Sequence, residues 1–349
     1  MRAAKHPATQ TLTYLPIIWG PLDKRDIFAF LADRLGRGRR AALVSLVDAT
    51  GTSMRAPGAH MAVDEDGTFV GSLSGGCIER AVIAEACDVI AEGTPRVTRY
   101  GQGSRYIDIR LPCGGGIDLH FQPLTDAALP RMALDAIQAR IPFALDLWTD
   151  PRPPDFIAAT RQTGWDAARG QATIGHWPNP RLLMVGHGAA MAKLAEQTRA
   201  WGGETALVTP DKALAADLAE DGFDTTVLTS PRDTSALVSD AWTAIVFLFH
   251  DHDWEPTLIA HALDQPHFYL GAMGSRRAHD ARCAALRMLG VPDAALAGIS
   301  APIGVFHSVR DPATLAISVL AEVADRFRNH DAFVASIPAL RGSKTRQIG

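Results

Sequence analysis

The chain has 349 residues, of which 47% are hydrophobic and 21% charged, and this composition excludes a disordered protein. Lys and Arg number 34 and Asp and Glu 38, so the net charge is −4. That balance argues against nucleic acid as the main partner, because phosphate binding needs a basic surface. The length favours about two domains.

The first half of the chain mixes helical and strand patterns. Apolar periodicity predicts helices and strands, and Asp66-Gly67 predicts a hairpin between the strands on either side of it. The predicted helices are 23–35, 77–91 and about 125–140; the predicted strands are 39–48, 60–63, 68–71, 106–111 and 117–122. We therefore expect one α+β domain over residues 20–150.

Prolines and glycines break every pattern between residues 148 and 180, so residues 151–180 are predicted to be a linker. After residue 181, apolar strands alternate regularly with helices. The predicted strands are 182–185, 205–208, 225–228, 244–249 and 268–271; the helices are 189–201, 213–220, 256–263, 276–289 and 312–328. This α/β alternation predicts a Rossmann-like, doubly wound parallel sheet over residues 181–335.

The four cysteines show no C-x-x-C spacing and are too few for a disulfide framework, which favours a reducing, cytoplasmic setting. Residues 1–20 lack the charged and apolar regions of a signal peptide. The longest apolar run, 241–249, is too short to span a bilayer. We therefore expect a cytoplasmic protein without a membrane partner.

Two cysteines lie against glycine runs. Cys77 follows Ser74-Gly75-Gly76, and Cys113 precedes Gly114-Gly115-Gly116. Glycines expose the backbone and let a ligand come close, so both thiols are candidates for chemistry. Cys77 is expected at a helix N-terminus, whose dipole lowers a thiol pKa, and Glu79 is a candidate base beside it. Cys87 and Cys283 lie in apolar helices and are expected in the core.

The segment between the strand 39–48 and the hairpin is rich in special residues. It contains hydroxyls, one arginine and glycines, of which Ser53, Arg55 and Gly58 are the candidate ligand contacts. These groups suit a phosphate or a polar, pterin-like ring. A long surface turn is the alternative.

Gly186-His187-Gly188 follows the first strand of the alternating domain and opens a helix, as in a dinucleotide fingerprint. The third glycine of that pattern is replaced by Met191, and Thr209 stands where a ribose-binding acid is expected. The motif therefore marks the fold. Two interpretations stay open: the domain binds NAD(P), or it is a Rossmann scaffold whose phosphate site has been emptied.

Two more motifs follow later strands. His250 and Asp251 lie just after the fourth strand, where ligands bind in parallel sheets. For these two residues, acid–base or hydrogen-bonding roles are favoured over metal binding. A plain solvated loop is an equally good interpretation. Gly274, Ser275 and Arg276 suit an anion. Alternatively, Ser275 is simply a helix cap.

Taken together, the motifs resemble those of the XdhC/CoxI family, the accessory proteins of xanthine dehydrogenase-type molybdenum hydroxylases. The matching stretches are ATGTSMRAPGAHM, GSLSGGCIE, LPCGGGIDL, LLMVGHGAAMAKLA, FLFHDHDWE, YLGAMGSRRAHDAR, APIGV and LAISVLAE. They span nearly the whole chain in the family's order.

The resemblance implies that the protein binds the molybdenum cofactor (molybdopterin) as cargo and delivers it to such a hydroxylase, after a cysteine desulfurase has placed the terminal sulfur. It places Cys77 and Cys113 near the cofactor, with Cys77 as a candidate molybdenum contact. It assigns Gly186, Gly188 and Ser275, together with Arg276, to a phosphate-binding region. It leaves a homodimer open.

The sequence favours a carrier over a turnover enzyme, because it contains no recognisable triad, zinc-binding spacing or Walker loop. Two alternatives stay open. One is an NAD(P)-dependent oxidoreductase. The other is an enzyme that modifies the cofactor through Cys77, as persulfide acceptor or nucleophile, with Glu79 or Asp251 as base. The carrier hypothesis predicts that Cys77 and Cys113 converge on one glycine-lined cleft facing the C-terminal domain.

Overall fold

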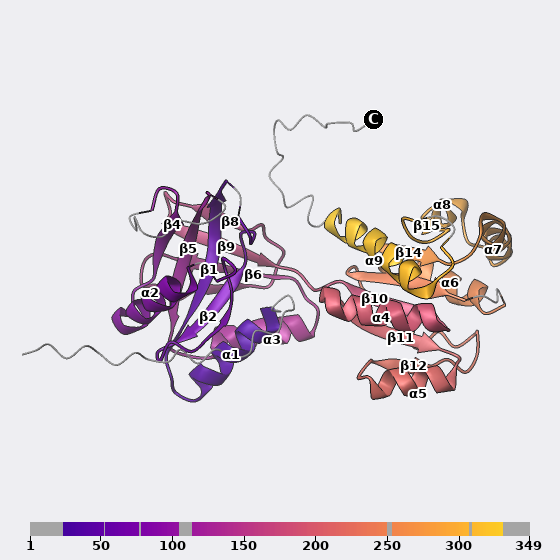
Figure 1. The fold of residues 1–349 in the computed structure, drawn as a ribbon, viewed down its shortest axis with the longest axis horizontal. Helices are drawn as coiled ribbons and strands as arrows, with labels where there is room; N and C mark the ends of the chain where they lie inside the picture. Colours follow the sequence, from indigo (N-terminus) through magenta and orange to yellow (C-terminus); the bar gives the residue numbers. More distant parts are fainter. Residues whose placement is uncertain are drawn as a thin grey trace, which may run out of the picture. The chain divides into compact units, whose positions relative to one another are not determined.

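The computed structural model describes residues 24–51, 53–76, 78–104, 114–249, 253–306 and 309–330. The chain divides into two compact units, Met1–Pro178 and Asn179–Gly349 (Figure 1). Within the described residues, no helix is long and apolar enough to cross a membrane.

The first unit is built on an antiparallel five-stranded sheet in the order β3-β2-β1-β5-β4. Its strands are β1 (Ala41–Thr50), β2 (His60–Asp64), β3 (Phe69–Gly71), β4 (Arg96–Gly101) and β5 (Gly116–Leu124). The hairpin predicted at Asp66-Gly67 is confirmed, because β2 and β3 pair antiparallel and Gly67 takes a φ of +80°. The strand expected at 106–111 lies outside the described residues.

A second, four-stranded sheet has the order β7-β6-β9-β8. Its strands are β6 (Phe143–Trp148), β7 (Asp155–Ile157), β8 (Gly164–Asp166) and β9 (Gln171–His176). Three of these lie within 151–178, so most of the expected linker 151–180 is a folded part of the first unit. The prolines at 151, 153 and 154 occupy the turn between β6 and β7, and for this reason they interrupted the strand pattern.

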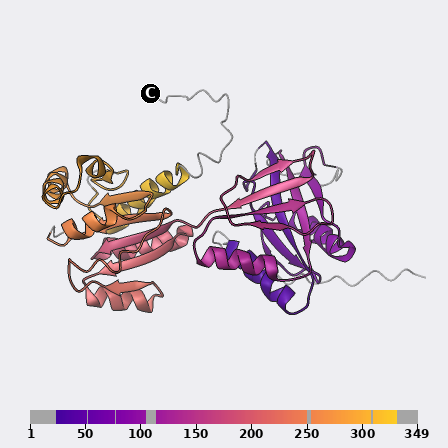
Figure 2. The same cartoon turned by 180° about the vertical axis from the view of Figure 1, so that it is seen from behind.

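Both faces of the five-stranded sheet are buried. On one face, Val44 and Leu46 pack against Val82 of α2 (Glu79–Glu92). On the other face, Leu43 packs in a cluster with residues of the four-stranded sheet and of two helices, α1 (Lys24–Gly36) and α3 (Ala128–Gln138). Phe28 of α1 belongs to this cluster. Figure 2 shows the unit from behind. Each buried side chain of this kind contributes about 2 kcal/mol to the stability of the fold. This packing on both faces holds the strands, and therefore their ends, in place.

The second unit is a parallel six-stranded sheet in the order β12-β11-β10-β13-β14-β15. The strands are β10 (Arg181–Gly186), β11 (Glu204–Thr209), β12 (Thr225–Val227), β13 (Thr243–Leu248), β14 (Tyr269–Ala272) and β15 (Ile299–Ser300). The helices are α4 (Ala189–Trp201), α5 (Lys212–Glu220), α6 (Glu255–Leu263), α7 (Arg276–Met288), α8 (Asp293–Leu296) and α9 (Pro312–Arg328).

This arrangement confirms the predicted α/β class and the Rossmann-like sheet. One face of the sheet packs against α4 and α9, through side chains such as Leu194 and Val319. The other face packs against α6 and α7, through Leu258 and Leu286. Coverage on both faces explains why the central strands are apolar throughout.

Candidate functional site

Three connections meet at one end of the five-stranded sheet. Because neighbouring strands are antiparallel, β1, β3 and β4 end there, and β2 and β5 begin there. The connections are residues 51–59, 72–78 and 102–115. We call this region, as far as it is described, the glycine end of the sheet.

The glycine stretches approach each other closely at this end. A Cβ added to Gly51 would lie 3.3 Å from Cα of Gly115, so the backbones of two connections are in contact. A Cβ on Gly75 would lie 3.1 Å from Cε of Met54, which joins the third connection. The structure thus brings together glycine motifs that lie far apart in sequence.

Cys77 and Cys113 lie outside the described residues, so their convergence stays a prediction. Their glycine neighbours are described. Gly76 has a φ of +108° and Gly114 a φ of +70°, and no atom of the described residues lies within 4 Å of a Cβ placed on either. Both therefore combine a glycine conformation with open space in front of the backbone.

Arg99 of β4 fastens the strand ends that form this region. Its Nη1 donates to Asp118 Oδ2 at 2.7 Å, its Nη2 to Thr50 Oγ1 at 2.5 Å and its Nε to the Gln102 carbonyl at 2.8 Å. Sequence reasoning missed Arg99. The signal that could have found it is cross-strand pairing, since Arg99 stands directly opposite Asp118 in the β4–β5 register.

Glu79 organises the turn that precedes α2. Its Oε1 accepts from Ser72 Oγ at 2.7 Å, from the Leu73 N–H at 3.3 Å and from the Ser74 N–H at 3.0 Å. Its Oε2 accepts from Ser74 Oγ at 2.7 Å and from the Ile78 N–H at 3.1 Å. The buried carboxylate therefore holds the Ser74-Gly75-Gly76 turn in one conformation.

Burial raises the pKa of Glu79, but hydrogen bonds from Ser74 and Ser72 outweigh it and lower the pKa to about 2. So acidic a carboxylate is a weak general base at neutral pH, and the geometry gives Glu79 a structural role in place of the expected basic one.

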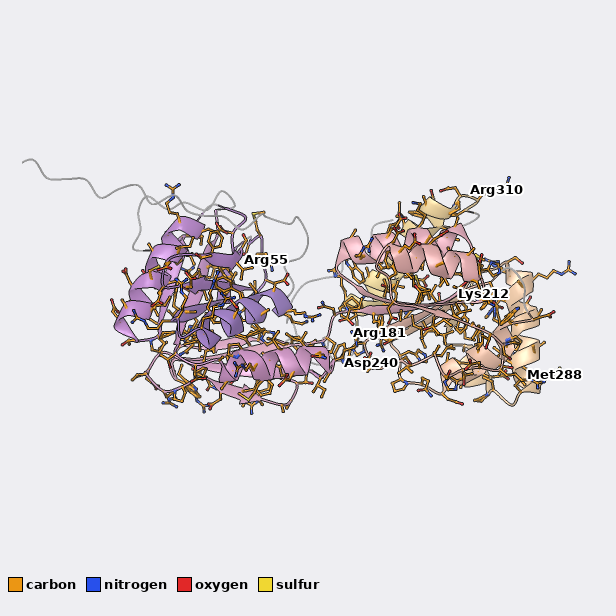
Figure 3. The ribbon with its side chains drawn as sticks, turned by 90° about the horizontal axis from the view of Figure 1, so that it is seen from below. Arg55, Arg181, Lys212, Asp240, Met288 and Arg310 are labelled. Carbon is orange, nitrogen blue, oxygen red and sulfur yellow. The ribbon has the colours of Figure 1, made fainter. Side chains whose placement is uncertain are left out.

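Hydrogen bonds to backbone carbonyls hold the connection 51–59. Gly58 N–H donates to the Leu46 carbonyl at 2.8 Å, and Ser53 Oγ donates to the Arg55 carbonyl at 2.8 Å. The half-buried Arg55 (labelled in Figure 3) makes no side-chain hydrogen bond or ion pair within the described residues. Its charge contributes to lowering the pKa of the nearby His60. A free guanidinium at the glycine end is suited to an anionic group.

Buried histidines lie beneath this connection and were missed by sequence reasoning. His60 Nδ1 lies 2.8 Å from Ser45 Oγ, and its Nε2 lies 3.3 Å from Nε2 of His176. His120, opposite Ser45 on β5, donates to the Trp148 carbonyl at 3.0 Å. Burial is the main cause that lowers the pKa values of His60 and His120 to about 4.

Over the described ranges, no group of three or more His, Cys, Asp or Glu side chains is placed to hold a metal ion. Their lowered pKa values keep these histidines neutral at pH 7. The His60 and His176 rings stack on each other and pack in the core around Phe28.

In the second unit, the two fingerprint glycines have different environments. A Cβ on Gly186 would lie 2.6 Å from the Leu248 carbonyl, so this glycine allows β10 and β13 to approach closely. Gly188, with a φ of +89°, caps α4 and has open space in front of it. Of these two, Gly188 is the one that an anion could approach at the helix N-terminus. The His187 ring packs edge-on against Phe249, with centroids 5.7 Å apart.

The ribose-binding acid of a dinucleotide site has no counterpart in the described structure. Thr209 is fully buried, and its Oγ1 accepts the Asp211 N–H at 3.2 Å. The Asp211 carboxylate caps α5 by accepting from the N–H groups of Ala213 and Leu214. Both polar groups near the end of β11 thus take part in local structure.

Ser275 is the N-cap of α7, because its Oγ accepts the Ala278 N–H at 3.2 Å. The alternative expected for Ser275 is therefore the one observed. Gly274 takes a φ of +135°, and Arg276 is exposed beside it. His250 and Asp251 lie outside the described residues.

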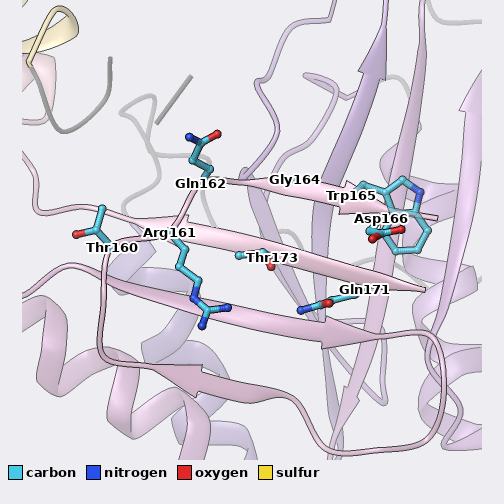
Figure 4. Close-up of a pocket in the computed structure, with 8 residues that line it drawn as sticks. All are labelled: Thr160, Arg161, Gln162, Gly164, Trp165, Asp166, Gln171 and Thr173. Atoms are coloured by element: carbon cyan, nitrogen blue, oxygen red, sulfur yellow. The ribbon is translucent and has the colours of Figure 1, made fainter. Parts of the chain in front are cut away.

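A shallow cleft of about 550 Å³ lies over β8 and β9 of the first unit (Figure 4). Arg161 crosses it toward Asp146, with Nη1 and Oδ2 3.3 Å apart. The lining residues are Thr160, Arg161, Gln162, Gly164, Trp165, Asp166, Gln171 and Thr173. None of the residues singled out in the sequence lines it.

Comparisons with known proteins cover both units. The model of the XdhC Rossmann domain matches residues 182–323, and that of the XdhC and CoxI family matches residues 35–101. The molybdenum cofactor insertion chaperone PaoD of Escherichia coli is 36% identical over 305 residues, which are 86% of this chain and 88% of PaoD. The uncharacterized protein YqeB of the same organism is 24% identical over 293 residues, 81% of this chain and 42% of YqeB.

Among solved structures, a Bacillus halodurans protein described as a xanthine dehydrogenase shares the fold. The TM-score is 0.71 at 21% identity, covering 89% of this chain and 98% of the other.

Proposed function

Because the chain belongs to the XdhC and CoxI family, we propose that it binds the molybdenum cofactor as cargo and delivers it to a xanthine dehydrogenase-type molybdenum hydroxylase. The name of PaoD, a molybdenum cofactor insertion chaperone, supports this proposal. The observation that carries it is the glycine end of the sheet, where the Gly51 backbone meets Gly115 and Met54 meets Gly75.

The glycine end offers what a bulky, phosphorylated cargo needs. Bare backbone at Gly76 and Gly114 leaves room for a large ring system. The free guanidinium of Arg55 can pair with a phosphate in the bidentate geometry that arginine favours. In this proposal, Cys77 and Cys113 flank the molybdenum, and Cys77 is its contact.

The finer steps belong to the same proposal. A cysteine desulfurase supplies the terminal sulfur before delivery, and a homodimer remains compatible with it. In the second unit, Gly188 and Arg276 are proposed to contact a phosphate, together with His250 and Asp251. Ser275 would take part through its backbone, because its hydroxyl already caps α7.

The arrangement favours a carrier over the alternatives. An NAD(P)-dependent oxidoreductase would need a ribose-binding group at the end of β11, where Thr209 and Asp211 are engaged in local hydrogen bonds. An enzyme acting through Cys77 would need a base, and the low pKa of Glu79 makes it a poor one.

Purification from cells that make the cofactor tests the proposal. We expect the full chain to carry molybdenum and pterin in comparable amounts, and Arg55→Gln to lower both about tenfold, the effect of losing about 1.4 kcal/mol of binding free energy. Arg37→Gln is the matched control, because Arg37 is exposed and precedes the opposite end of β1.

Two results would contradict the proposal. One is wild-type protein that carries neither molybdenum nor pterin, in cells whose hydroxylase is activated normally after deletion of this chain. The other is equal cargo loss in Arg55→Gln and Arg37→Gln, which would remove Arg55 from the binding site.

A further inference from the structure

Met54 is an exposed apolar side chain at the glycine end. It keeps 71% of its surface exposed, although a buried methionine would gain about 2 kcal/mol. Its immediate neighbour in sequence is the free cation Arg55. Exposure of a large apolar group beside an unpaired charge points to a surface that a ligand covers.

The connection 51–59 does not depend on Met54 for its shape. Three hydrogen bonds hold it in place: from the Gly58 N–H to the Leu46 carbonyl, from the Leu46 N–H to the Ala59 carbonyl at 2.9 Å, and from Ser53 Oγ to the Arg55 carbonyl. The Met54 side chain extends from this fixed backbone across to another connection. Removing it should therefore cost little stability.

What Met54 contacts is the bare backbone of the turn that Glu79 holds. A Cβ on Gly75 would lie 3.1 Å from Cε and 3.2 Å from Sδ, closer than ordinary side-chain packing. Met54 can occupy this place because Gly75 has no side chain. The thioether consequently lies at the junction of two connections, against Gly75.

We infer that Met54 is a specificity-determining contact for the cargo, covering the face of the flat pyrimidinone ring of its pterin while Arg55 pairs with its phosphate. This inference rests on the proposed function. A thioether is soft and polarisable, and it packs well against conjugated rings. The pair would select a ligand that combines a flat ring with an anionic group, and it would disfavour a free anion or a neutral ring.

Oxidation by hydrogen peroxide, read by mass spectrometry, tests the contact. Molybdopterin released from a purified molybdenum hydroxylase is added to the full chain, and oxidation of each methionine is followed. We expect Met54 to oxidise about tenfold more slowly in the loaded protein. Met288, 90% exposed in the second unit (Figure 3), is the internal control and should not change.

Two variants separate this inference from the proposed function. Met54→Ala should release the pterin about tenfold faster, and Met54→Leu, which restores apolar volume, should release it within about threefold of wild type. If wild type binds the pterin but Met54 is not protected, or Met54→Ala releases it at the wild-type rate, the inference is wrong and the proposed function stands. If wild type binds no pterin, both are wrong.

Discussion

Single residues of the first unit show how its polar groups are divided between packing and ligand binding. Glu79 makes several hydrogen bonds to the connection 72–78, and Arg99 bonds to Thr50 and Asp118 at the strand ends and to the Gln102 carbonyl. His60 and His120 are buried and held neutral. Among the described residues, Arg55 makes no side-chain hydrogen bond or ion pair and Met54 is exposed, and we therefore propose ligand contact for these two.

The buried histidines predict a loss of stability in acid. Their pKa values are about 4 in the folded chain and 6.5 in the unfolded chain, so the unfolded state binds more protons below pH 6.5. The contribution of these histidines to the free energy of unfolding is complete above pH 6.5 and is lost as pH falls toward 4. At pH 5 the loss is about 2 kcal/mol per histidine. Hydrogen exchange at pH 7.5 and pH 5, corrected for intrinsic rates, should show faster opening of β1, β2 and β5.

The second unit and a variant provide the controls for this experiment. The amides of β10 and β13 do not pack on these histidines and should change less. His120→Gln removes one of three buried histidines whose pKa is lowered, the others being His60 and His176, and should reduce the pH effect in the first unit by about a third. Equal acceleration in both units, or no effect of His120→Gln, would show that these histidines are not the cause.

At the scale of elements, the antiparallel order of the five strands creates the glycine end. Gly93 and Gly114 allow a matched test of its function, because both take a φ of +70° with open space around them. Gly93 ends α2, whereas Gly114 lies at the glycine end. Alanine should strain either backbone by about 1–2 kcal/mol. We expect only Gly114→Ala to lose cargo, measured as pterin per chain after purification.

If Gly93→Ala loses as much pterin as Gly114→Ala, general destabilisation explains the loss and the glycine end is not the binding site. Thermal unfolding of both variants checks that the backbone strain is indeed comparable.

The sequence predicted most elements with strong periodicity, including the parallel sheet and the hairpin at Asp66-Gly67. It missed β4, because the two apolar residues of Arg96–Gly101, Val97 and Tyr100, are three positions apart and do not alternate with polar ones. It missed β6, because Phe143–Trp148 carries a buried Asp146, and it missed β7, β8 and β9, which lie among prolines and glycines. The glycine motifs were found from sequence. That these motifs lie together was not predicted, because it depends on the order of the strands. The hydrogen bonds of Arg99 were not predicted either, because they depend on the cross-strand register.

The whole molecule divides between Pro178 and Asn179 into units of different design. The first unit gathers its glycines and its free arginine at one end of an antiparallel sheet. The second has a Rossmann-like sheet whose polar groups near β11 and α7 are largely used as caps. This contrast supports the proposal that the first unit binds the pterin, and among the described residues of the second unit the helix end at Gly188 stays open to a phosphate.

Hydrogen exchange with and without added molybdopterin tests this central claim most directly. We expect slower exchange in all three connections of the glycine end, 51–59, 72–78 and 102–115, with the α2 C-terminus at Gly93 unchanged. Protection confined to the second unit, or absent from the glycine end while the pterin is bound, would contradict it.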